Sequence, residues 1–144
     1  MDPREEHVRT DSRPLAGHEL EGWWGDNPPY HVPVFILTHH ARPPIQMKGN
    51  TTYHFVTGGI HEALDQARKA ADGMDVRIGG GPNTIQQYLR SGLVDELHVA
   101  IAPVLLGRGE RLFEEVDLRS SGYECVQLVG SEEATQAVLR RQAQ

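Results

Sequence analysis

The sequence predicts a three-layer α/β domain built around a mixed β-sheet. Short apolar segments of strand length alternate with two segments of helical period, an order that implies parallel strands joined by right-handed crossovers. Two alternating segments at the C-terminal end, 123–128 and 135–141, predict an antiparallel hairpin. The chain of 144 residues is long enough for one domain with a sizeable core.

Hydrophobic periodicity sets the expected elements. Residues 34–38 form a continuous apolar run, as in a strand that is covered on both faces. Residues 60–71 carry apolar side chains at helical spacing, and Asp72-Gly73 is a typical helix end. In chain order we expect strands at 34–38 and 53–57, a helix at 60–71, a strand at 76–78, a helix at 83–91, a strand at 93–104 and the two strands of the hairpin.

Composition excludes several classes of function. The formal charge of −6, without a basic stripe, argues against general nucleic-acid binding. No apolar run approaches the roughly 20 residues of a membrane span, and residues 1–14 are charged and lack the apolar segment of a signal peptide. Cys125 is the single cysteine, which excludes an internal disulfide and fits a reducing cytoplasm.

The first 31 residues are expected to be poorly ordered, because proline, glycine and charged residues alternate there without a helical or strand period. The exception is the segment Trp23–Tyr30, whose aromatic side chains follow one another closely before and after a turn at Asn27-Pro28-Pro29. Two interpretations remain open. The aromatic residues anchor a loop on the domain surface, which we favour, or they stack on a substrate.

A glycine turn between strand and helix is the first candidate site. Val76–Ile78 runs into Gly79-Gly80-Gly81, which removes every Cβ from the turn, and Pro82 suits the first position of a helix. The amides of Gly81, Asn83 and Thr84 would then face outward at the positive end of the helix dipole, as in a phosphate site. The spacing is neither that of G-x-G-x-x-G nor that of a P-loop. A turn that only lets the helix pack closely on the sheet therefore remains an equal alternative.

A polar turn after the first strand is the second candidate. Thr38, His39, His40 and Arg42 precede two prolines. We reject a zinc site, because neighbouring residues at a strand end point apart and no carboxylate or cysteine stands at ligand spacing. The hydroxyl, imidazole and guanidinium groups could instead gather a second phosphate or stack on an adenine.

Three blocks of the sequence carry a resemblance to a known family. The blocks are Val76–Gly81 with Gln87-Tyr88-Leu89, then Gly92–Leu97 with Pro103–Gly109 and Leu112-Phe113, and Trp24–Tyr30 with Val34–His39. The chain resembles the dihydrofolate-reductase-like family, in the branch of the RibD C-terminal domain, the reductase of riboflavin biosynthesis. The resemblance implies a three-layer α/β/α dihydrofolate-reductase-like fold over residues 23–144, preceded by a poorly ordered segment at 1–22.

The resemblance also implies a cofactor, NADPH. Carried over, Gly79, Gly80, Gly81, Asn83 and Thr84 contact its pyrophosphate, and Thr38, His39 and His40 take the adenosine and its 2′-phosphate, with Arg42 as a helper. The substrate would be a small heterocycle, similar to 5-amino-6-(5-phosphoribosylamino)uracil or to a pterin. A cytoplasmic homodimer is expected.

The chain departs from the family at its start. Family members open with a strand, a helix and a second strand, and we expect none of these in residues 1–22, so that the fold is N-terminally truncated. A late start of the reading frame, a degenerate paralogue and a partner chain that supplies the strand are competing explanations. No catalytic residue is carried over, because the family's substrate-side residues fall in that part. A non-catalytic nucleotide-binding or structural paralogue, or an interaction module that pairs through a sheet edge, are therefore the alternatives to a reductase.

Overall fold

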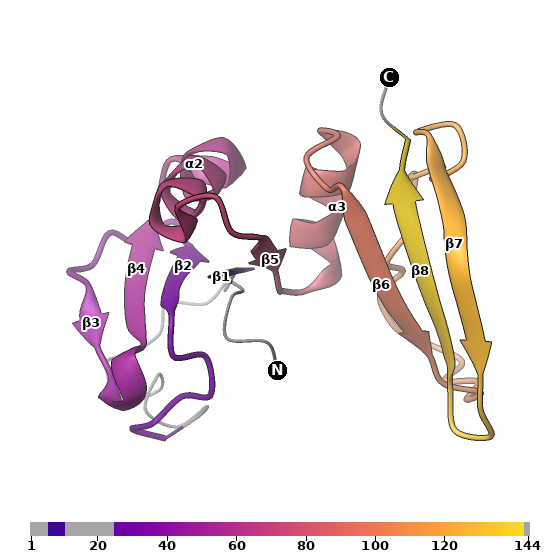
Figure 1. Ribbon diagram of the computed structural model, residues 1–144, viewed down its shortest axis with the longest axis horizontal. Helices are drawn as coiled ribbons and strands as arrows, with labels where there is room; N and C mark the ends of the chain where they lie inside the picture. Colours follow the sequence, from indigo (N-terminus) through magenta and orange to yellow (C-terminus); the bar gives the residue numbers. More distant parts are fainter. Residues whose placement is uncertain (1–5, 11–24, 143–144) are drawn as a thin grey trace. The chain divides into compact units, whose positions relative to one another are not determined.

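The computed structural model describes residues 6–10 and 25–142 of the chain (Figure 1). The chain divides into two compact units, residues 1–84 and 85–144. Each unit has its own β-sheet, and each is described by itself.

The first unit contains a five-stranded sheet with the order β3-β4-β2-β1-β5 (Figure 1). Four of its strands are parallel, and the short β3 is antiparallel to β4, so the sheet is mixed as predicted. All four parallel strands therefore end at the same edge of the sheet. The strands are β1 (Glu6–Thr10), β2 (Pro33–Leu37), β3 (Ile45–Gln46), β4 (Thr52–Val56) and β5 (Val76–Ile78).

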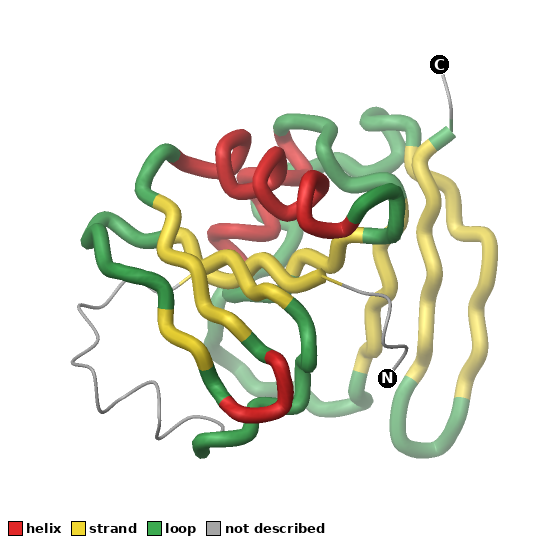
Figure 2. Tube along the Cα trace, turned by 60° about the vertical axis from the view of Figure 1, so that its left-hand side comes forward, coloured by secondary structure: helices red, strands yellow, loops and turns green. Residues whose placement is uncertain are grey.

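Helix α2 (Gly59–Ala71) lies across this sheet (Figure 2). Its buried residues, Ala63, Leu64, Ala67 and Ala71, recur at helical spacing, as the sequence predicted. Three of the four are alanines, which let the helix approach the strands closely. The helix ends at Asp72, whose φ of 48° is left-handed.

A second apolar cluster forms around Tyr30, Val34, Ile36 and Tyr53. Val34 lies opposite Tyr53 in the parallel register of β2 and β4. Tyr30 is 8% exposed, so the interpretation of its segment as a surface anchor is confirmed for this residue, whereas Trp23 and Trp24 lie outside the described residues.

Polar contacts hold the same segment against the 3₁₀ turn η1 (Lys48–Asn50). Asp26 forms an ion pair with Lys48, and His31 Nδ1 lies 2.6 Å from the carbonyl oxygen of Gly49. The His31 amide donates to the hydroxyl of Thr51, which is fully buried. These contacts lie at the N-terminal ends of β2 and β4, away from the edge where the parallel strands end.

One prediction about the N-terminal segment is wrong. We expected no strand in residues 1–22, but β1 lies inside the sheet, between β2 and β5 and parallel to both. The segment Glu-His-Val-Arg-Thr contains one aliphatic residue, so hydrophobic periodicity gave no strand signal. Main-chain pairing on both sides defines the strand instead, a case in which tertiary context outweighs propensity. The domain boundary at residue 23 stays a prediction.

The second unit contains most of α3 (Pro82–Arg90) and a three-stranded antiparallel sheet with the order β6-β8-β7. Its strands are β6 (Glu96–Ile101), β7 (Tyr123–Gly130) and β8 (Thr135–Arg141). The predicted C-terminal hairpin is β7 and β8, with an irregularity between Cys125 and Gln127. No helix in the described part of the chain is long and apolar enough to cross a membrane.

Candidate functional site

Both predicted site segments leave the same edge of the first unit's sheet. Leu37, the last residue of β2, lies opposite Thr10 of β1 and Val56 of β4, and Ile78 of β5 lies opposite Val8. The turns after β2 and β5 are separated by one strand, and hence by about 10 Å at the usual strand spacing. In open α/β sheets, ligands bind at the carboxyl ends of parallel strands. The geometry therefore places the two clusters within reach of one extended ligand.

The glycine turn after β5 is open to solvent. Gly80 and Gly81 are exposed, and Gly79 is half-buried. Gly80 has a φ of 158°, in a region of the backbone map that is nearly restricted to glycine. A Cβ built on Gly81 would meet no atom within 4 Å, so the space over this residue is free for a ligand.

The first turn of α3 follows directly. Pro82 is its first residue, where the missing amide proton costs nothing. Asn83 is exposed, but Thr84 is only 2% exposed. Of the five residues expected at the pyrophosphate, Thr84 is thus the one that lies in the interior rather than at the surface of the turn.

The turn after β2 is fixed by its own threonine. The Thr38 amide donates to the carbonyl of Val56 at 3.0 Å and extends the β2–β4 ladder by one residue. The Thr38 hydroxyl accepts a hydrogen bond of 3.1 Å from the amide of His40, which closes a local turn. His39 and His40 are exposed beyond this turn. A hydroxyl oxygen can still accept a second hydrogen bond and donate one.

Arg42 lies over the ring of Phe55, with its guanidinium carbon 5.9 Å from the ring centroid. This distance is within the range of a cation–π interaction. Phe55 belongs to β4, one residue before the end of that strand. Arg42 is therefore held near the same sheet edge, with part of its guanidinium surface already occupied by an aromatic ring.

A second glycine turn at this edge was missed by the sequence reasoning. Gly58 and Gly59 connect β4 to α2, and a Cβ built on Gly58 would lie 1.6 Å from Glu62 Oε2. The Glu62 carboxylate thus covers Gly58 at the positive end of the helix dipole. Gln66 Nε2 donates to Glu62 Oε1 at 3.0 Å and holds it there. The available signal was an acidic residue within the first turn of a helix that follows a glycine pair.

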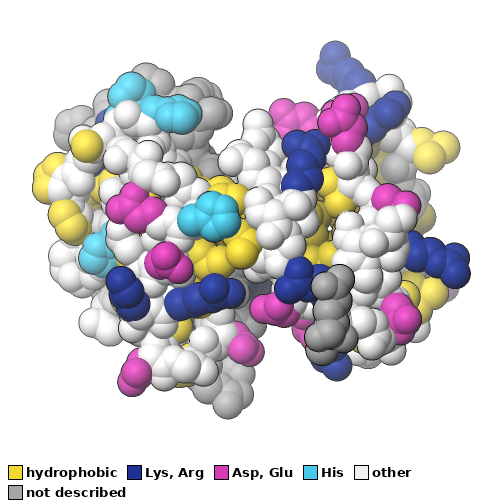
Figure 3. Space-filling model, turned by 90° about the horizontal axis from the view of Figure 1, so that it is seen from above, with side chains coloured by type: hydrophobic (Ala, Val, Ile, Leu, Met, Phe, Trp, Pro, Cys, Tyr) yellow, Lys and Arg dark blue, Asp and Glu magenta, His cyan; other side chains and the backbone are white. Residues whose placement is uncertain are grey.

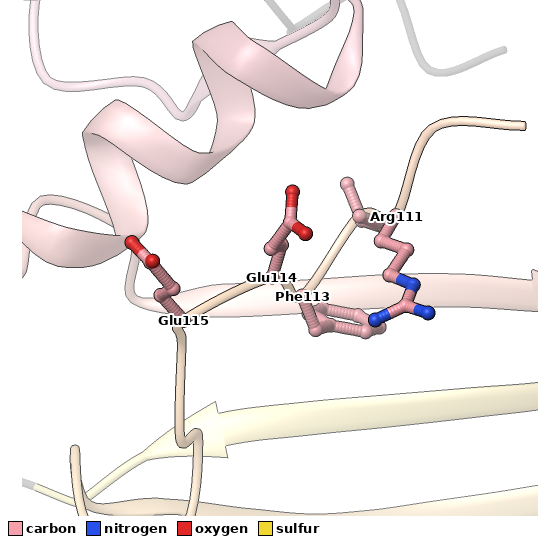
Figure 4. Close-up of a pocket in the computed structure, with 5 residues that line it drawn as sticks. Arg111, Phe113, Glu114 and Glu115 are labelled. Atoms are coloured by element: carbon pink, nitrogen blue, oxygen red, sulfur yellow. The ribbon is translucent and has the colours of Figure 1, made fainter.

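The second unit has a surface pocket of about 560 Å³ (Figure 4). Its loop is tied to α3, because Gln86 donates to the carbonyl of Arg111 at 2.7 Å and Arg90 donates to that of Glu114 at 3.1 Å. In Figure 4 the Phe113 ring and the Arg111 guanidinium lie on one side of the loop, and two carboxylates lie on the other. The lining residues are Arg111, Leu112, Phe113, Glu114 and Glu115.

Within residues 6–10 and 25–142, no group of three or more His, Cys, Asp or Glu residues could hold a metal ion. His98 lies on β6 and is exposed.

Comparison with known proteins defines the class. The sequence profile of the RibD C-terminal domain family matches residues 8–139, and the chain belongs to this family. The resemblance predicted from the three sequence blocks is therefore confirmed. The match begins within β1, which accords with a strand of the fold at that position.

One curated relative is YyaP of Bacillus subtilis strain 168, an uncharacterized protein that is 37% identical over 65 residues. This match covers 45% of the chain and 34% of YyaP, so the matched part spans about a third of the relative's length.

Solved structures share the fold. A protein of Shewanella sp. PV-4, which its description assigns to riboflavin biosynthesis, has 24% identity and a TM-score of 0.70 over 96% of this chain and 74% of its own. The deaminase and 5-amino-6-(5-phosphoribosylamino)uracil reductase of Thermotoga maritima has 13% identity and a TM-score of 0.61, over 95% of this chain and 38% of its own. The riboflavin biosynthesis reductase of Saccharomyces cerevisiae has 13% identity and a TM-score of 0.55, over 96% of this chain and 73% of its own. At these identities the likeness establishes the dihydrofolate-reductase-like fold.

Proposed function

We propose that the chain is an NADPH-dependent reductase domain that acts on a small heterocyclic substrate. The observation that carries the proposal is the exposed glycine turn after β5, which opens into α3 at the same sheet edge as the Thr38–Arg42 turn. Membership of the RibD C-terminal domain family supports the reaction class.

The pyrophosphate of NADPH would bind at the glycine turn. Main-chain amides of Gly79, Gly80, Gly81 and Asn83 are candidates to donate to it, with the positive end of the α3 dipole behind them. Because the chain carries a formal charge of −6, its overall field gives no help, and such local donors must supply the affinity. The free space over Gly81 fits a ligand that approaches the main chain closely.

The adenosine end would lie at the turn after β2. Thr38, His39 and His40 are proposed to contact the ribose and its 2′-phosphate, and Arg42 supplies a permanent positive charge to this segment. NADPH, when bound, supplies a hydride to the substrate, and the residues named here would bind and orient the cofactor. We assign no catalytic residue.

The description of a solved neighbour supports the proposed substrate class. The description of the Thermotoga neighbour names 5-amino-6-(5-phosphoribosylamino)uracil, and we propose a substrate of this kind or a pterin-like heterocycle. A homodimer is also proposed, supported by the exposed apolar side chains of Leu105, Leu106 and Leu128 in the second unit. Exposed, unpaired Cys125 is consistent with the reducing cytoplasm as its compartment.

Titration of the purified protein with NADPH, followed by the fluorescence of the reduced nicotinamide, tests the proposal. We expect saturable binding, together with loss of absorbance at 340 nm when a suitable pyrimidine or pterin is added. Binding without turnover over a panel of such substrates would favour the non-catalytic paralogue. If neither NADPH nor NADH binds at millimolar concentration, the reductase proposal is wrong.

A further inference from the structure

The two glycine turns of the first unit differ in what covers them. A Cβ placed on Gly81 would meet no atom within 4 Å, whereas one placed on Gly58 would overlap the carboxylate of Glu62 at 1.6 Å. Both turns precede a helix, α3 and α2 respectively, and both lie where parallel strands end. One helix start is thus open to a ligand, and the other already has an anionic group of the protein beside it.

The turn that Glu62 covers follows β4, the strand next to the one that leads into the proposed adenosine end of the site. Val56, from which the chain turns through Gly58 into α2, accepts the hydrogen bond of the Thr38 amide. The turns after β2 and β4 therefore leave neighbouring strands at the same level, about 5 Å apart. Because the Glu62 carboxylate lies over Gly58 in the second of these turns, we expect it on the order of 10 Å from the main chain of His39 and His40.

The charges around this turn are mixed. Within Thr38–Arg42, Arg42 alone carries a permanent positive charge, and its guanidinium lies against Phe55. Seen from above in Figure 3, the first unit has histidine, acidic and basic side chains interspersed, without a patch of one sign. Among the described residues near this turn, a bound 2′-phosphate would therefore face the cation of Arg42 and the carboxylate of Glu62.

Resting on the proposed function, we propose that Glu62 is a specificity-determining residue that weakens the preference for NADPH over NADH. Its carboxylate repels the negative charge of a 2′-phosphate in NADPH. It does not repel the 2′-hydroxyl of NADH, because a carboxylate oxygen can accept a hydrogen bond from a hydroxyl group. Gly58 is what permits this position of Glu62, since any larger residue there would displace the carboxylate. The preference of the chain for NADPH over NADH is accordingly smaller than it would be without this carboxylate.

The test uses E62Q in the full chain. Glutamine has the shape of glutamate and can keep the contact with Gln66, so the fold is retained while the charge is removed. The control is D72N, which removes one negative charge from the other end of the same helix, about 15 Å away. Asparagine accepts the left-handed backbone of Asp72.

Calorimetric titrations with 2′,5′-ADP, 5′-ADP, NADPH and NADH measure the outcome. For each pair, 2′,5′-ADP with 5′-ADP and NADPH with NADH, the measured quantity is the ratio of the two affinities. In E62Q we expect this ratio to rise about three- to tenfold in favour of the 2′-phosphorylated ligand, and in D72N we expect no change. The gain should shrink in 0.5 M salt. An unchanged ratio in E62Q, with the ligands still bound, would overturn the role of Glu62 and leave the proposed function intact. Absence of binding of all four ligands to both wild type and E62Q would overturn the proposed function and this inference together.

Discussion

The phenolic hydroxyl of Tyr123 donates a hydrogen bond of 2.5 Å to the main-chain carbonyl of Val94, and both residues are buried. The bond joins the start of β7 to the segment between α3 and β6, 29 positions earlier. Nearby, Arg141 at the end of β8 donates to the carbonyl of Gly92, and its amide donates to that of Asp95 at 2.9 Å. These contacts fix the end of the three-stranded sheet where β7 begins and β8 ends.

Replacement of Tyr123 by phenylalanine should therefore destabilise the chain by about 1–2 kcal/mol, because the ring is kept while the Val94 carbonyl loses its buried partner. Urea unfolding measures the change. S131A, at the exposed turn between β7 and β8, is a control for the loss of a hydroxyl near the surface, and we expect it to cost less. A Tyr123→Phe variant as stable as the wild type would show that water replaces the phenol at this carbonyl.

Alkaline pH should destabilise the protein through Tyr88. Burial raises the pKa of Tyr88 from 10.0 to about 12. Below pH 10 the phenol is neutral in the folded and unfolded chain alike, and stability does not depend on it. Between pH 10 and 12 the unfolded chain ionises first, so the free energy of unfolding falls by up to about 2–3 kcal/mol in total. Unfolding by urea at pH 9 and pH 11 should show the fall, and Tyr88→Phe should reduce it. An equal fall in that variant would assign the effect to other groups, Tyr123 among them, whose pKa is also raised by burial.

Gly81→Val tests the glycine turn without straining the fold. The space over Gly81 is empty of protein atoms, so the folded state should accept the side chain, whereas a bound pyrophosphate should not. We expect NADPH affinity to fall tenfold or more, with little change in melting temperature. Gly80→Val should also abolish binding, although its φ of 158° adds backbone strain. The matched control is Gly130→Val, at another open glycine in the second unit. Undiminished affinity in Gly81→Val would show that the phosphates bind elsewhere.

Substitution of Gly49 should destabilise the first unit. Its φ is 69°, and a Cβ there would meet Asn27 Oδ1 at 2.2 Å and His31 Nδ1 at 2.8 Å. Gly49→Ala should cost about 2–4 kcal/mol, from backbone strain together with displacement of the loop. Gly25 has a similar φ of 64° but no neighbour within 4 Å, so Gly25→Ala isolates the strain and should cost about 1 kcal/mol. Equal costs measured by thermal unfolding would mean that the loop moves aside freely.

Strong hydrophobic periods made most of the fold predictable. The predicted strand at 76–78 matches β5, and the helix predicted at 60–71 begins one residue earlier, at Gly59. The strand predicted at 93–104 is shorter, because Leu93 and Val94 belong to the connection after α3 and β6 ends at Ile101, before Pro103. Periodicity could not find β1, which is defined by pairing on both sides, or β3, which has two residues.

The candidate site was predictable as residue types but not as an arrangement. Glycines before a helix identify a turn from which side chains are absent, and this is visible in Gly79-Gly80-Gly81. The burial of Thr84 and the position of Glu62 over Gly58 depend on how each helix start packs against its strand. Sequence spacing carries no signal for the burial of Thr84, and for Glu62 it offers only an acidic residue in the first turn of a helix that follows a glycine pair.

The internal position of β1 in the sheet also has a consequence for synthesis. Glu6 is paired with Val76, 70 positions later, so β1 must wait for the synthesis of β5 before both of its sides are bonded. Closing such a loop is entropically costly and slow. Nascent chains that end before β5 should therefore remain accessible to protease and chaperone, and the first unit should mature only once that strand has emerged.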